Sequence, residues 1–91
     1  MARYVGLHTL PGFTREMLAE ATPALETFDS PRFLRAYTAF SEGKVVCEWE
    51  AADKPAVARA YEKLGFPYDE IVRIEAICVS GDDGHTSTTS V

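Results

Sequence analysis

The feature that most constrains the fold is residues 44–66, KVVCEWEAADKPAVARAYEKLGF, because the hydrophobic pattern changes its period within this stretch. Up to residue 51 apolar and polar side chains alternate, which predicts a strand with two different faces. Beyond Asp53 the apolar residues recur every three or four positions until Gly65, which predicts an amphipathic helix with an N-cap and a glycine C-cap. A strand that leads directly into a helix indicates a fold that packs the two in layers.

The remaining elements follow from the same two periodicities. Alternation predicts three further strands, at residues 3–8, 32–40 and 70–79. The short SEGK connection contains a glycine and joins the second and third strands as a hairpin. Another helix begins after Thr14, and Pro23 inside it is expected to kink or break it near Thr22.

The order strand–helix–strand–strand–helix–strand is the signature of a ferredoxin-like βαββαβ sandwich of the α+β class. We therefore expect one domain over residues 1–79, with a four-stranded antiparallel sheet and two helices on one face. Right-handed crossovers are expected to place the first and third strands side by side and parallel at the centre. The second strand then pairs with the third, and the fourth with the first. Residues 80–91 are small and polar without periodicity, so we interpret them as a flexible tail in which His85 is solvated.

The alternation also sorts the side chains between the two faces of the sheet. The face under the helices is expected to be apolar and to carry Val5, Leu7, Leu34, Ala36, Thr38, Phe40, Val45, Cys47, Trp49, Val72, Ile74 and Ala76. The uncovered face is expected to be polar and to carry Tyr4, His8, Arg35, Tyr37, Glu48, Glu50, Arg73 and Glu75. Because 91 residues form a small core, we expect this uncovered face to dock a second copy as a homodimer.

Composition excludes several classes of partner. A net charge of −5 without clustered lysine and arginine argues against nucleic acid and anionic membrane surfaces. No apolar run approaches the roughly 20 residues of a membrane span, and the N-terminus does not resemble a signal peptide, so we expect a cytoplasmic protein. A glycine-rich phosphate loop is missing, so no nucleotide cofactor is expected. Cys47 and Cys78 are expected to be buried, reduced and unpaired.

His8 is the most informative candidate for a site, because it ends the first strand near the end of the third. An imidazole that converges with the carboxylates of Glu48 and Glu50 would suit a divalent first-row metal such as nickel or zinc. Side chains expected to line a ligand site beside it are Tyr4, Arg35, Tyr37 and Arg73. The sequence leaves open whether the uncovered face carries only cross-strand ion pairs.

Two other functions also remain open at this stage. A small enzyme of the dimeric α+β barrel type could use His8 or Glu48 as acid or base, with Tyr37 and Arg35 orienting the substrate. A plain interaction domain would need only the dimer. Nothing in the sequence indicates a particular reaction.

Three stretches resemble a small bacterial family described as nickel-binding or of unknown function. They are LHTLPGFT at residues 7–14, RFLRAYTAF at 32–40 and CEWEAADKPAVARAYEKLGFPYDEIVRIEAI at 47–77. The matching positions include His8, Cys47, Glu50, Gly65 and Asp69. The resemblance implies a ferredoxin-like fold, a dimeric α+β barrel and, by analogy with some members, binding of Ni²⁺.

Overall fold

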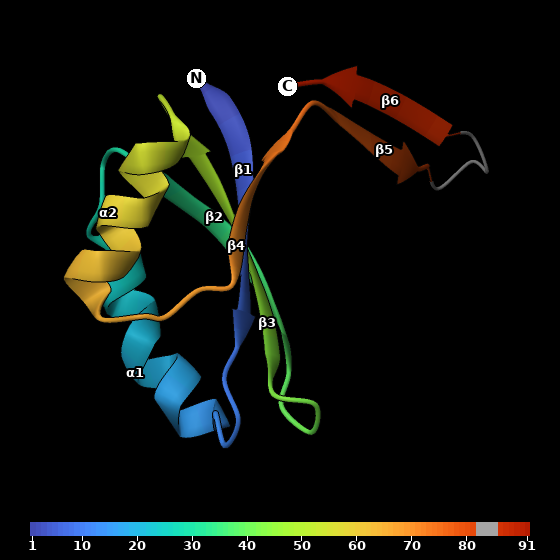
Figure 1. Ribbon diagram of the computed structural model, residues 1–91. Helices are drawn as coiled ribbons and strands as arrows, with labels where there is room; N and C mark the ends of the chain where they lie inside the picture. The colour runs from blue at the N-terminus through green and yellow to red at the C-terminus, as the bar shows by residue number, and fades with distance from the viewer. Residues whose placement is uncertain (82–85) are drawn as a thin grey trace.

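The computed structural model describes residues 1–81 and 86–91, and it is a layered α+β structure with both helices on one face of the main sheet (Figure 1). The elements in chain order are β1 (Ala2–Thr9), α1 (Arg15–Glu26), β2 (Arg32–Ala39), β3 (Lys44–Ala51), α2 (Lys54–Leu64), β4 (Glu70–Ile74), β5 (Ala76–Ser80) and β6 (Thr86–Ser90). The four-stranded sheet has the order β2-β3-β1-β4, and β5 and β6 form a separate two-stranded sheet.

The predicted ferredoxin-like fold and both predicted neighbour pairs are confirmed. The expected parallel pairing of β1 with β3 is wrong, because these strands run antiparallel, as do β1 with β4 and β2 with β3. The reason lies in the connections: the crossover through α1 returns β2 in the direction of β1, and the hairpin then reverses the chain into β3. The sheet is therefore antiparallel throughout.

The helix ends follow the predicted capping chemistry. The Thr14 side chain accepts a hydrogen bond from the backbone N–H of Met17 at 3.2 Å, and Asp53 accepts one from Ala56 at 2.9 Å. Gly65 ends α2 in the left-handed conformation with φ of 72°. The expected break near Thr22 does not occur, because α1 continues through Pro23 to Glu26.

The two faces of β1 are the reverse of the prediction. Tyr4, Gly6 and His8 are buried under the helices, whereas Val5 and Leu7 lie on the uncovered face. Gly6 explains the inversion, because a Cβ atom there would stand 2.0 Å from the Tyr61 hydroxyl oxygen of α2. The missing side chain lets the Tyr61 ring lie directly on β1, and this close approach fixes which face of β1 the helices cover.

β4 is inverted together with β1, because Gly6 pairs with Ile71 and Val5 pairs with Val72. Ile71 is therefore buried under the helices, and Val72 and Ile74 lie on the uncovered face.

On β2 the expected division of side chains between the two faces largely holds. A register shift at Leu34 separates Phe33, which pairs with Trp49, from a regular segment in which Ala36 and Thr38 lie under the helices. Arg35 and Tyr37 lie on the uncovered face as predicted.

Trp49 and Tyr61 are the centre of the core, and both are fully buried. The Trp49 indole Nε1 donates a hydrogen bond to the Tyr61 hydroxyl oxygen at 2.7 Å, so their polar atoms are paired inside the core. Phe28 and Phe33 pack edge-on against Trp49. This aromatic cluster joins β2, β3 and α2 and supports the covered face of the sheet.

The C-terminal segment differs from the expected tail. The predicted strand at 70–79 splits into β4 and β5, and β5 pairs antiparallel with β6, where Ala76 faces Ser90 and Ser80 faces Thr86. The resulting hairpin projects from the side of the sheet opposite the helices (Figure 1). His85 lies outside the described residues. No helix in the described part of the chain combines the length and apolar character needed to span a membrane.

Candidate functional site

His8 lies at the end of β1 on the face covered by the helices, and the residue is 3% exposed. Nδ1 lies 2.7 Å from the carbonyl oxygen of Pro67, and because a carbonyl can only accept, Nδ1 carries the proton and donates. The ring meets the Tyr61 ring edge-on, with centroids 4.6 Å apart. Nε2 is buried without a hydrogen-bond partner among the described residues. The neutral ring therefore holds a buried, unused lone pair on Nε2.

A cavity of about 400 Å³ adjoins His8 at this end of the sheet. Its lining consists of Leu7, His8, Thr9, Lys44, Val45, Val46, Asp69 and Glu70. Asp69 is held in place, because its carboxylate accepts a hydrogen bond from the Thr9 hydroxyl at 2.6 Å and its backbone N–H donates to Leu7 at 2.7 Å. The cavity is thus lined by a histidine and two acidic residues, of which Glu70 pairs with Leu7 and so lies on the uncovered face.

Burial lowers the pKa of His8 below its ordinary value, and the hydrogen bond to Pro67 and the charge of Asp69 oppose this shift only partly. The unfolded chain therefore binds a proton at a higher pH than the folded chain does. The contribution of neutral His8 to the free energy of unfolding is therefore fully present above about pH 6.5. It is lost as the pH falls from there through the pKa of folded His8.

We expect urea titrations between pH 7.5 and 5.5 to show a falling free energy of unfolding. In His8→Phe, which keeps a ring against Tyr61 but cannot titrate, the fall should be reduced or absent. An equal slope in both proteins would contradict the assignment to His8.

The structure does not bring His8 together with Glu48 and Glu50. Val5 pairs with Glu48 and His8 pairs with Val45, so the two glutamates lie on the uncovered face and the imidazole on the covered one. The cause is the inversion of β1 that Gly6 permits. In the described ranges no set of three histidine, cysteine or acidic side chains is arranged to hold a metal ion.

Glu48 and Glu50 instead take part in an ion-pair network on the uncovered face. Arg3 contacts Glu48 at 2.6 Å and Glu50 at 3.9 Å, and Arg35 contacts Glu48 at 3.1 Å from the other side. The Glu48 side chain is 14% exposed, so this pair of guanidinium groups satisfies a carboxylate that is largely removed from water. This part of the uncovered face therefore carries cross-strand ion pairs, which is the alternative that the sequence left open.

Arg35 and Tyr37 line a second cavity, of about 470 Å³, between the uncovered face and β5. The other lining residues are Val5, Glu48, Ile74, Ala76, Ile77, Cys78 and Val79. Tyr4 and Arg73, the other two residues predicted to line a ligand site, do not contribute. They pair with each other on the helix-covered side, where Tyr4 is buried and Arg73 is exposed at the edge.

The two cysteines differ in their environment, although both are free thiols. Cys47 is buried as expected, and burial raises the pKa of its thiol to about 11. At neutral pH it is therefore a protonated thiol that packs against Tyr61 rather than a thiolate. The expectation of burial is wrong for Cys78, which is exposed on β5 because β4 ends at Ile74 and the hairpin leaves the main sheet.

Sequence reasoning missed Pro67, Asp69 and Glu70 as neighbours of His8. The signal that could have found them is the pairing of β1 with β4, which was predicted. In an antiparallel pair the residues just before one strand lie beside the end of the other, so residues 67–70 must meet His8.

Together these features define a small ferredoxin-like α+β protein with a buried, singly hydrogen-bonded histidine at one end of its sheet. The sequence matches the family described as nickel responsive protein SCO4226-like over residues 4–74, and the chain belongs to this family. The structure is similar to the crystal structure of SCO4226 from Streptomyces coelicolor A3(2), with a TM-score of 0.72 and 27% sequence identity over 80% of this chain and 95% of that chain. No curated protein matches the sequence significantly.

The comparison confirms the resemblance to a small nickel-related bacterial family. The matched region ends at residue 74, which is the last residue of β4. His8, Asp69 and Glu70 lie inside it, whereas the β5–β6 hairpin lies beyond it.

Proposed function

We propose that this chain is a nickel-binding protein that acts as a homodimer and holds the cation at His8. The observation that carries the proposal is the buried Nε2 of His8, which has no partner among the described residues while Nδ1 donates to Pro67. Imidazole nitrogen is a suitable ligand for Ni²⁺. A backbone carbonyl on the second ring nitrogen is a typical contact of a histidine that binds a metal. The description of the family as nickel responsive supports the choice of metal.

Asp69 would supply an oxygen donor, because it lines the same cavity as His8 and its charge acts on the His8 ring. Glu70 also lines this cavity, but it pairs with Leu7 and so lies on the uncovered face. Bound Ni²⁺ would neutralise the negative charge of Asp69 in this partly enclosed space. Water or a second copy of the chain would have to complete the coordination, because the described residues of one chain do not offer a set of three ligands.

A thermal melt with increasing NiCl₂ tests the proposal. Free metal at about 100 times its dissociation constant stabilises the folded state by roughly 2.7 kcal/mol. For a domain of this size, that corresponds to a rise in melting temperature of about 10 °C or more. We expect His8→Gln to abolish the rise, because the amide cannot supply an imidazole lone pair.

Two matched double variants decide which carboxylates matter. Asp69→Asn with Glu70→Gln should weaken the response to nickel, because both residues line the His8 cavity. Glu48→Gln with Glu50→Gln should leave it intact, because neither residue lines this cavity. The reverse result would favour the ligand set expected from sequence, and an unchanged response in His8→Gln would refute the site.

The uncovered face supports the homodimer part of the proposal. Its centre is formed by five partly buried aliphatic side chains: Val5, Leu7, Val46, Val72 and Ile74. Arginine and glutamate side chains surround this centre and are paired within the chain. We expect such a patch to pack against the same patch of a second copy, as a two-fold interface between identical subunits requires. The free thiols of Cys47 and Cys78 are compatible with the expected cytoplasmic location.

A second candidate function is binding of a small organic ligand in the cavity beside β5. Arg35, Tyr37 and Glu48 line it, as expected for a ligand site on this face, and its volume of about 470 Å³ falls in the usual range. Glu48 lies between the guanidinium groups of Arg3 and Arg35, so both of its carboxylate oxygens are already paired within the chain. The cavity therefore supports binding more than acid–base catalysis.

A further inference from the structure

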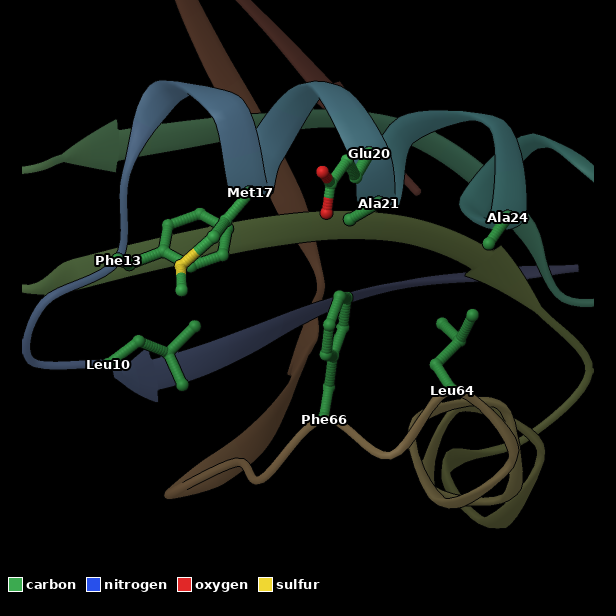
Figure 2. Close-up of a pocket in the computed structure, with 8 residues that line it drawn as sticks. All are labelled: Leu10, Phe13, Met17, Glu20, Ala21, Ala24, Leu64 and Phe66. Atoms are coloured by element: carbon green, nitrogen blue, oxygen red, sulfur yellow. The ribbon is translucent and has the colours of Figure 1, made fainter.

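A separate apolar cavity of about 420 Å³ lies between α1 and the segment that ends α2. Its lining consists of Leu10, Phe13, Met17, Glu20, Ala21, Ala24, Leu64 and Phe66. Figure 2 shows Phe66 standing between α1 above it and the Leu10 and Leu64 side chains on either side. None of these residues lines the His8 cavity, so the two sites are independent.

The cavity exists because α1 presents small side chains to the sheet. Met17, Glu20, Ala21 and Ala24 line the cavity from one edge of the helix, where Met17 and Glu20 are exposed. The stripe of α1 that faces the core runs through Leu18, Ala21, Thr22 and Leu25. Ala21 and Ala24 are too short to reach Phe66 and Leu10, and α1 is buried in the core through Leu25 farther along. Space is therefore left under the first two turns of the helix.

Glu20 is an exposed residue at the edge of this cavity. Its carboxylate points into the cavity toward Phe66 (Figure 2). Glu20 forms no ion pair within the described residues, and every other lining side chain is apolar. A single carboxylate at the edge of an apolar cavity favours a ligand that joins an apolar body to a positive charge.

We propose that this cavity binds a small hydrophobic amine, with its apolar part among Phe13, Met17 and Phe66 and its ammonium group at Glu20. The walls favour an apolar ligand because burial of apolar surface is the dominant favourable contribution to its binding. The single carboxylate selects a positive charge, and the faces of the two phenylalanine rings also attract cations. An anionic ligand of the same shape meets the unpaired charge of Glu20 and is rejected.

Three probes of similar shape test the proposal: 2-phenylethylammonium, 2-phenylethanol and 3-phenylpropionate. Titration of the isotope-labelled protein, followed by NMR at the amides of Ala21 and Ala24, gives the affinity for each. We expect the ammonium to bind most tightly and the carboxylate most weakly. Glu20→Gln should reduce the preference for the ammonium over the alcohol by about fivefold, as expected for loss of one partly exposed ion pair.

Glu16→Gln is the matched control, because Glu16 lies on the same helix but does not line the cavity. It should leave all three affinities unchanged. Ala24→Phe should fill the cavity and remove binding of all three probes. Glu20→Leu should lose the ammonium preference while it keeps binding of the alcohol, because it removes the charge and leaves the walls of the cavity apolar. Equal binding of the three probes, or no shifts at Ala21 and Ala24 with millimolar ammonium, would overturn the proposal.

Discussion

Replacement of Gly6 by alanine is expected to lower the free energy of unfolding by about 3 kcal/mol or more, the upper range for overpacking a core. The added Cβ would lie 2.0 Å from the Tyr61 hydroxyl oxygen and 2.7 Å from Cζ. Tyr61 has no exposed surface and accepts the indole hydrogen bond of Trp49, so its ring can move only by disturbing the core. Since small domains have about 5–15 kcal/mol of stability, a urea titration should show a large loss.

A second glycine separates the steric effect from the conformational one. Gly65 has φ of 72°, but a Cβ there would meet no atom within 4 Å. Gly65→Ala should therefore cost only about 1–2 kcal/mol, from the left-handed backbone alone. In a Tyr61→Leu background the effect of Gly6→Ala should shrink, because the clashing atoms are gone. Equal losses for Gly6→Ala and Gly65→Ala in the wild-type background would show that Tyr61 is not the cause.

The order of the elements could be read from the sequence because each element carries its own local signal. The alternation of β3, the cap at Asp53 and the glycine at Gly65 depend only on nearby residues. The face of β1 could not be read in this way. Its two sets of side chains, Val5 with Leu7 and Tyr4 with His8, are both compatible with burial. The contact between Gly6 and Tyr61 decides between them, and it joins residues far apart in the chain.

The same long-range contact explains why the predicted metal ligands His8, Glu48 and Glu50 do not come together. The sequence indicates His8 because it ends the first strand near the end of the third, but the ligand set with Glu48 and Glu50 requires His8 to lie on the uncovered face. Because the contact between Gly6 and Tyr61 places His8 on the covered face, Glu48 and Glu50 lie on the opposite face, where they pair with Arg3. Arg35 and Tyr37 were placed correctly, because their positions depend on the hairpin with β3 and not on β1.

Replacement of Val5 by aspartate is expected to convert the proposed homodimer into a monomer. Val5 lies at the centre of the uncovered aliphatic patch, and in a two-fold interface each copy would bury one new carboxylate. Burial of an unpaired charge costs several kcal/mol, so two such charges should weaken the dimer by about a thousandfold or more. Sedimentation equilibrium over a range of protein concentrations measures this change directly.

Ala19→Asp provides the matched control, because Ala19 is exposed on α1 in the helix layer, away from the uncovered face. It adds the same charge and should leave the dimer intact. High salt should also leave the wild-type dimer intact, because Arg3, Arg35 and Glu48 are already paired within one chain and the aliphatic patch supplies the driving force. A wild-type protein that stays monomeric at high concentration, or a Val5→Asp dimer of unchanged affinity, would rule out this face as the interface.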